Sequence, residues 1–280
     1  MDGIYKLSAT GNSFLFINFL NPDSRPSYEN QFKKKSRASL ARELCNPHHS
    51  VGADGLLFIE PSSRADLKWD FYNADGSRAE MCGNAARCAG LFVRSVLMRS
   101  DLQPSFTLET LSGVITITTV SDSVVQVEMP QIKETKYNIF IKYGRQKIFF
   151  NYVNSGVPHA VVRLKSLRSL QKPSLNVDNL EGIVDKIRKL KVFTRRGVNV
   201  TFYSPSSQSR IESLTFERGV MGYTQACGTG AVAAAYTFAG GKERTIIVNV
   251  PGGQLKVDLH NARPHLEGSV KFIAEIKIWP

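Results

Sequence analysis

The chain has 280 residues and a formal net charge of +12, and 42% of its residues are hydrophobic. This length fits one large domain or two of about 140 residues, and the apolar fraction excludes global disorder. No apolar run reaches the ~18 residues of a membrane-spanning helix, and the N-terminus carries no secretory signal. We therefore expect a cytoplasmic protein without membrane contact, whose cysteines are free thiols.

The positive charge favours anionic partners over long range without identifying one. One short basic run is present, Lys33-Lys34-Lys35 followed by Arg37. Nucleic-acid binding through such a run needs interleaved aromatic residues or a reader motif, and neither accompanies it. We interpret the run as solvated surface and expect no nucleic-acid partner.

Short β-branched or aromatic segments bounded by Gly, Pro, Asn or Ser predict strands along the chain. The first half contains predicted strands at 14–19, 55–59, 67–71, 113–120 and 124–129, and a predicted helix at 84–99. The second half contains predicted strands at 160–164, 198–203, 213–216, 245–250 and 254–259, and predicted helices at 180–190 and 229–239. A last predicted strand, 270–279, returns to the first half. We predict an α/β (α+β) fold in which each half wraps a curved, mostly antiparallel sheet around a central helix.

The chain repeats itself at a nearly constant spacing. The segments around Cys82 (MCGNAA) and Cys227 (ACGTGA) lie 227 − 82 = 145 residues apart, close to half the chain. Further pairs with this spacing are 10–11 with 155–156, Phe14 with His159, 52–54 with 197–199, and 71–73 with 216–218. Self-similarity of this kind predicts a duplicated unit. We expect residues 1–129 with 268–280 to form one half, residues 130–267 the other, and the cleft between them to hold the active site.

Cys82 and Cys227 stand at the predicted N-termini of the two central helices, and each is followed by glycine. Unpaired N–H groups and the helix dipole favour a thiolate there and can also hold a carboxylate. With pseudo-twofold packing, the Cα of a small amino acid would lie between the two sulfurs. A thiolate on one face and a thiol on the other can then invert that centre without a cofactor. The alternative interpretation is two buried, inert cysteines.

Several segments resemble the signature segments of diaminopimelate epimerase. They are 73–77 (NADGS), 81–88 (MCGNAARC), 217–219 (ERG) and 226–231 (ACGTGA), and shorter segments in the same order extend the resemblance from residue 10 to residue 257. That family interconverts LL- and meso-diaminopimelate in bacterial lysine and peptidoglycan precursor synthesis. The resemblance implies an amino-acid substrate, no cofactor, no metal and a homodimer.

The resemblance also implies a role for each matching residue. It implies that Cys82 and Cys227 are the two bases and that His159 and Glu217 influence their protonation. The residues implied to hold the reacting carboxylate are Gly83, Asn84, Gly228 and Thr229. The residues implied to contact the substrate, mostly at its distal end, are Asn12, Asn73, Asn199, Glu217 and Arg218. The chemistry agrees, because arginine can grip a carboxylate bidentately and glutamate can pair with an ammonium.

The sequence departs from the family pattern around this core. Ser13 replaces a usual Asp, Arg78 a common Glu, and Ala85 a common Gly. Val157 stands where part of the family has Asn, which would remove one side-chain contact to the distal carboxylate of the substrate. The loop from Glu217 to Cys227 is one residue longer than usual, and Tyr223 stands near the customary Glu. These changes affect recognition of the distal end of the substrate more than the type of reaction.

Two rival functions stay open at this point. One is a racemase of another amino acid in the same superfold, and the other is a non-catalytic binding protein that uses the basic surface. A zinc site is not expected, since Cys45, His48 and His49 are only three local ligands without a second cluster. The sequence also leaves open which of the two helix-terminal cysteines is the thiolate in the resting protein.

Overall fold

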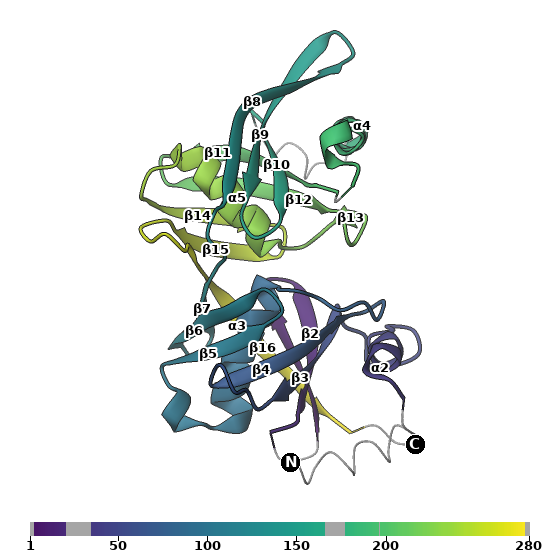
Figure 1. Ribbon diagram of the computed structural model, residues 1–280, viewed down its shortest axis with the longest axis vertical. Helices are drawn as coiled ribbons and strands as arrows, with labels where there is room; N and C mark the ends of the chain where they lie inside the picture. The colour runs from purple at the N-terminus through teal and green to yellow at the C-terminus, as the bar shows by residue number, and fades with distance from the viewer. Residues whose placement is uncertain (1–2, 21–34, 166–176, 196, 278–280) are drawn as a thin grey trace. The chain divides into compact units, whose positions relative to one another are not determined.

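The computed structural model describes residues 3–20, 35–165, 177–195 and 197–277. Lys33 and Lys34 of the basic run and the end of the predicted last strand lie outside these ranges. The chain divides into two compact units, which are described one at a time. Unit 1 comprises Met1–Val127 and Gly268–Pro280, and unit 2 comprises Glu128–Glu267 (Figure 1).

Unit 1 is a sheet that closes on itself around a buried helix. Its strands are β1 (Ile4–Ala9), β2 (Asn12–Asn18), β3 (Gly55–Glu60), β4 (Leu67–Asn73), β5 (Ser105–Thr110), β6 (Gly113–Ser121), β7 (Val124–Glu128) and most of β16 (His265–Ile276). They follow one another in this order, and β1 also pairs with β16. The central helix, α3 (Gly83–Phe92), packs against β1, β2 and β6, and all of its residues are buried.

A second helix of unit 1, α2 (Arg37–Leu44), covers the outer face of this sheet at β3 and β4. This explains why β2 is a nearly unbroken apolar run instead of alternating with polar residues. Phe16 faces inward and stacks on Phe92 of α3, with ring centroids 5.1 Å apart. Leu15 and Ile17 face outward and join a core cluster with residues of α2.

Unit 2 repeats the plan. Its strands are β8 (Glu134–Tyr143), β9 (Gln146–Asn154), β10 (Pro158–Arg163), β11 (Asn199–Ser207), β12 (Arg210–Glu217), β13 (Gly222–Tyr223), β14 (Thr245–Val250) and β15 (Gly253–Asp258). The sheet order is β15-β14-β12-β11-β10-β9-β8, with β13 beside β12. The central helix α5 (Gly228–Ala239) packs against the sheet from β9 to β15, and α4 (Val177–Arg188) packs against β8 and β11 (Figure 1).

The pattern of strand pairing repeats between the two units. In unit 1 the parallel pairs are β2–β3 and β4–β5, and in unit 2 they are β10–β11 and β12–β14. The pairs β1–β2 and β3–β4 in unit 1, and β11–β12 and β14–β15 in unit 2, are antiparallel. The helices α3 and α5 begin at Gly83 and Gly228, 145 residues apart. The predicted fold of two alike, mostly antiparallel halves around central helices is confirmed.

Several elements differ from the sequence prediction. The strands β1, β5, β8, β9 and β13 and the helix α2 were not expected, and β16 begins before residue 270. The β8–β9 hairpin extends beyond the rest of the unit 2 sheet (Figure 1), so most of β8 is exposed and only Ile141 of this strand is buried in the core. The predicted helix 84–99 ends early, because a π-helical turn (Val93–Leu97) follows Phe92 and Met98 then adopts a left-handed conformation with φ of 50°.

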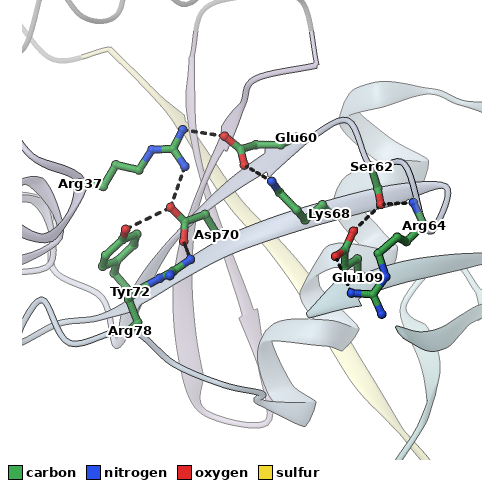
Figure 2. A network of polar contacts seen from close by, with 9 residues as sticks. All are labelled: Arg37, Glu60, Ser62, Arg64, Lys68, Asp70, Tyr72, Arg78 and Glu109. Carbon is green, nitrogen blue, oxygen red and sulfur yellow. Dashed lines mark hydrogen bonds and ion pairs between the residues drawn. The ribbon is translucent and has the colours of Figure 1, made fainter. Parts of the chain in front are cut away.

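A network of charged side chains joins α2 to the outer face of the unit 1 sheet (Figure 2). Arg37, the first residue of α2, donates to Glu60 of β3 and to Asp70 of β4, each over 2.6 Å. Its guanidinium also lies over the ring of Phe58, 4.6 Å from the centroid. The first residue of α2 is therefore hydrogen-bonded to two strands, β3 and β4.

The two carboxylates of this network are both largely buried. Burial raises their pKa values, but the hydrogen bonds from Arg37 outweigh burial, helped by Lys68 at Glu60 and by Arg78 at Asp70. Both pKa values therefore lie below those of ordinary carboxyl groups. Groups of this kind stabilise the fold above their unfolded pKa, about 4, and the stabilisation is lost as the pH falls through the folded pKa.

Arg37→Met should lower the free energy of unfolding at pH 7 by about 2 kcal/mol, because it leaves two buried carboxylates short of their shared cation. Urea denaturation of both proteins measures this difference. The difference should shrink as the pH falls below about 4, where the carboxyl groups become protonated. Arg64→Met is the matched control, since Arg64 is exposed in its pair with Glu109 (Figure 2) and should matter by less than about 0.5 kcal/mol. An Arg37→Met deficit that is unchanged at pH 3 would contradict this account.

Candidate active site

Strand register brings the predicted site residues of unit 1 to one edge of its sheet. β2 and β3 are parallel with Phe14 opposite Gly55, and β3 and β4 are antiparallel with Gly55 opposite Asn73. The start of β2, which is Asn12, and the end of β4 therefore lie at the same edge. The chain then leaves β4 and enters α3, with Cys82 as the N-cap residue.

Unit 2 uses the same construction. β10 and β11 are parallel with His159 opposite Asn199, and β12 runs back against β11 to end at Glu217. The chain then enters α5, with Cys227 as the N-cap residue. Each unit thus presents one cysteine, one helix N-terminus and the ends of three strands.

Neither cysteine caps its helix with its side chain. Both have extended backbone conformations, and neither thiol makes a side-chain capping hydrogen bond. An N-cap Ser, Thr or Asp would occupy the first-turn N–H groups with its own oxygen, whereas a thiol is a weak acceptor. Gly83 and Gly228 follow the cysteines and present no side chain to a ligand. The two first turns can therefore offer backbone N–H groups to an anion.

Asn12 and Asn84 meet in unit 1. The Asn84 Nδ2 group donates to Asn12 Oδ1 over 2.9 Å. The Nη2 group of Arg87 donates to Asn84 Oδ1 over 2.5 Å and to Thr10 Oγ1 over 2.8 Å. Asn73 makes a different contact, because its Nδ2 group donates to Ser77 Oγ over 3.0 Å in the turn after β4.

His159 lies at the centre of a polar cluster in unit 2. Its Nδ1 atom is 2.9 Å from Thr201 Oγ1, and its Nε2 atom is 2.9 Å from Thr229 Oγ1. Thr229 Oγ1 is in turn 3.5 Å from Cys227 Sγ, so the hydroxyl links the imidazole to the thiol. Burial lowers the pKa of His159 to about 3, with a smaller contribution from the charge of Arg218. The imidazole is therefore neutral at physiological pH.

Asn199, Glu217 and Arg218 form the outer side of this cluster. The backbone N–H of Arg218 donates to Asn199 Oδ1 over 2.9 Å, and Asn199 Nδ2 is 3.4 Å from His159 Nε2. Thr224 Oγ1 donates to Glu217 Oε1 over 2.7 Å. Hydrogen bonds therefore connect the first turn of α5 to His159, Asn199 and the backbone of Arg218, while Glu217 contacts the segment that leads to Cys227.

Sequence reasoning missed Thr201, Thr215 and Arg87. Thr201 and Thr215 face α5 from β11 and β12, with their hydroxyls 3.1 Å apart. They leave no room at Gly230, where a Cβ would lie 2.4 Å from Thr215 Oγ1. The sequence did carry a signal for this polar inner face, because Asn199 and Thr201 alternate with apolar residues and alternate residues of a strand lie on the same face. The signal for Arg87 was a cation inside an otherwise apolar helical segment.

Three of the residues that depart from the family pattern, Arg78, Tyr223 and Ser13, make local contacts in the structure. Arg78 pairs with Asp70 over 2.7 Å and so belongs to the network that holds α2. Tyr223 packs edge-on against Phe216, with ring centroids 5.3 Å apart, beside the core of α4. Burial raises the pKa of Tyr223 to about 12, so it does not replace a carboxylate. The backbone of Ser13 exchanges hydrogen bonds with Asp54, over 2.7 and 2.8 Å.

The described ranges hold neither a cluster of metal ligands nor a membrane-spanning helix. No three His, Cys, Asp or Glu side chains in them gather as metal ligands would. None of the helices in them is both long and apolar enough to cross a membrane.

Solved structures share this fold at low sequence identity. A hydroxyproline epimerase from Agrobacterium vitis has a TM-score of 0.71 at 16% identity, covering 99% of this chain and 92% of that chain. A phenazine biosynthesis protein of the PhzF family from Bacillus anthracis has a TM-score of 0.71 at 14% identity, covering 99% of both chains. Likeness at these identities establishes the fold alone.

Sequence relatives are much closer. The family profile described as Diaminopimelate epimerase matches residues 4–133 and 151–273. A diaminopimelate epimerase from Hydrogenobaculum sp. is 34% identical over 281 residues, covering 97% of this chain and 96% of that protein. One from Aquifex aeolicus is 35% identical over 238 residues, covering 82% of this chain and 79% of that protein. A profile match over most of the chain and relatives above 30% identity place this protein in the diaminopimelate epimerase family, a family of isomerases.

Proposed function

We propose that this protein interconverts LL- and meso-diaminopimelate by proton transfer at Cα, with Cys82 and Cys227 as the two bases. The observation that carries the proposal is the pair of cysteines that begin α3 and α5, each followed by glycine and neither used as a helix cap. Family membership supplies the substrate.

The chemistry follows from these groups. A thiolate removes the Cα proton from one face of the substrate and becomes a thiol, and the other thiol delivers its proton to the opposite face and becomes a thiolate. In the reverse direction the two cysteines exchange roles. The carboxylate next to Cα takes up charge as the C–H bond breaks, and the N–H groups of a helix N-terminus stabilise that charge. The reaction balances with these two protons alone.

The remaining site residues divide by position. Asn84 and Thr229 stand in the first turns of α3 and α5, where they suit the reacting carboxylate. Arg218, Glu217 and Asn199 lie at the strand ends of unit 2 and suit the distal amino-acid end, since it carries one carboxylate and one ammonium. His159 is neutral and acts through the Thr229 hydroxyl on Cys227.

We also infer a cytoplasmic location and a homodimer. All four cysteines are free, and a two-thiol mechanism needs a reducing compartment. The dimer rests on the family resemblance alone, and sedimentation of the reduced protein tests it.

Hydrogen exchange at the substrate Cα in D₂O, followed by NMR, tests the reaction without any coupling enzyme. The wild type should exchange the Cα proton of LL- and meso-diaminopimelate, whereas Cys82→Ala and Cys227→Ala should each slow exchange at least about 100-fold, because each removes an acid–base group. Cys45→Ala is the matched control. Cys45 is buried against α2, where burial raises its pKa to about 12 and leaves it an inert thiol.

Lysine, histidine and proline offered in the same experiment separate the rival functions. Exchange of one of these in place of diaminopimelate would keep the two thiols and change the substrate. A lack of exchange with all of them, from folded and reduced protein, would contradict the proposed reaction and favour a binding protein.

Arg218→Met should lower kcat/KM for diaminopimelate by about 10- to 150-fold, mainly through KM, because a charge-assisted bond to the distal carboxylate is worth about 1.5–3 kcal/mol. Steady-state kinetics in both directions measures the change. Arg244→Met is the control, since the Arg244 guanidinium donates to the carbonyl of Gln208 at an exposed turn. Equal kinetics for Arg218→Met and wild type would remove Arg218 from substrate recognition.

A further inference from the structure

Arg87 is a buried cation without a carboxylate partner among the residues that the structure describes. Its side chain, in the second turn of α3, has no exposed surface. Its hydrogen bonds go to neutral oxygens, those of Thr10, Asn84 and the Gly83 carbonyl, and its Nη1 atom has no partner within the described ranges. Burial lowers the pKa of Arg87 to about 10, which still leaves it charged at neutral pH.

Such a charge is costly to bury unless an anion lies nearby. The position makes the cost higher, because a helix N-terminus already carries positive potential and normally disfavours a cation. The long side chain also points back toward the N-terminus of its helix, as helical side chains do. The first turn of α3 therefore combines two positive contributions, and an anion there would offset both.

Among α3 itself and the strands β1, β2 and β6 packed against it, one titratable candidate for that anion is left. Cys88 is fully buried, and burial raises its pKa, so it stays a thiol. On β1, the Lys6 ammonium donates to the Val51 carbonyl, and the Tyr5 ring packs on Phe92 at the other end of α3. β2 and β6 carry no titratable side chain. Cys82, the N-cap residue of α3, remains.

The matching position in unit 2 is not charged. Adding the repeat spacing of 145 to position 87 gives Val232, which is fully buried in α5. Tyr152 of β9 stacks on Phe193, and Tyr203 of β11 packs edge-on against Phe238. On β15, Lys256 pairs with Glu267 and Asp258 pairs with His260. β14 has no titratable side chain. The charged groups at this edge are Glu217 and Arg218, and His159 is neutral.

The hydrogen bonds of unit 2 are those of a protonated Cys227. Asn199 Oδ1 accepts from the N–H of Arg218, so its Nδ2 group is the atom that faces His159 Nε2. Nε2 is then an acceptor, and the Nδ1–H group donates to Thr201. The Thr229 hydroxyl donates to Nε2 and keeps its oxygen free to accept from the Cys227 S–H group.

We propose that Arg87 holds Cys82 as the thiolate of the resting protein, while Cys227 carries the proton. Arg87 is a positioning residue, because it acts on the substrate only through Cys82 and Asn84. The meaning of this assignment for catalysis rests on the proposed function. The assignment itself concerns the charge of two thiols and is testable without substrate.

The test is the rate of iodoacetamide alkylation at each cysteine as a function of pH, read by peptide mass spectrometry on the full, reduced chain. The pH midpoint of each curve is compared, because the two thiols differ in exposure and therefore in absolute rate. We expect the Cys82 midpoint to lie below that of Cys227. Arg87→Met should raise the Cys82 midpoint by about one unit or more, which at pH 7 slows alkylation about tenfold, and should leave Cys227 unchanged.

Arg87→Lys keeps the charge and should retain the low Cys82 midpoint. Arg78→Met, which removes a guanidinium that is half exposed in the same unit, should change neither midpoint. A lower midpoint at Cys227 than at Cys82 in the wild type would overturn the proposal without any variant. So would an unchanged Cys82 midpoint in a folded Arg87→Met protein, with folding checked by circular dichroism. If Arg87→Met does not fold, the wild-type midpoints decide alone.

The alkylation experiment tests the charge assignment and the exchange experiment tests the proposed reaction, so a failure of one can be told from a failure of the other. Wild-type protein with a low Cys82 midpoint but no Cα exchange would keep the charge assignment and remove the diaminopimelate reaction. Protein that exchanges diaminopimelate but has the lower midpoint at Cys227 would keep the reaction and remove the role of Arg87.

Discussion

Each unit buries the N-terminus of its central helix, where unpaired N–H groups and the helix dipole concentrate positive potential. A serine or aspartate at the N-cap would satisfy part of this potential internally, whereas Cys82 and Cys227 leave it for an external anion. The sheet around each helix then serves to deliver strand ends to that point. Parallel pairing of β2 with β3, and of β10 with β11, brings polar residues far apart in sequence to one edge.

The two units share a backbone plan and differ in their inner chemistry. Unit 1 lines the inside of its sheet with Phe14 and Phe16 and places its cation on the helix, at Arg87. Unit 2 places His159 where unit 1 has Phe14, and Val232 where unit 1 has Arg87. A duplicated scaffold with unlike inner surfaces suits the proposed reaction, which needs two thiols in opposite protonation states. The outer face of unit 1 holds α2 instead, through the ion pairs of Arg37 with Glu60 and Asp70.

Most of the fold followed from local signals. The repeated Cys-Gly segments, the alanine-rich run of α5 and the strands rich in β-branched residues marked both halves and their central helices. The missed elements lacked such signals, because β8 belongs to an exposed hairpin and α2 is a short helix whose first residue is fixed by Glu60 and Asp70 from distant strands. The early end of α3 depends on the left-handed backbone of Met98, which residue type alone does not specify.

The sequence by itself determined the family, the two cysteines and the kinds of residues that surround them, because these are encoded in contiguous motifs. Only the tertiary structure decided which of these residues meet. It brings Asn12 into contact with Asn84, and it connects His159 to Cys227 through Thr229. It shows that Arg78 pairs with Asp70 and that Tyr223 packs on Phe216. It also showed that Arg87 is buried without a carboxylate partner within the described ranges. Burial and hydrogen-bond partners depend on strand register and long-range packing, which a chain read residue by residue does not contain.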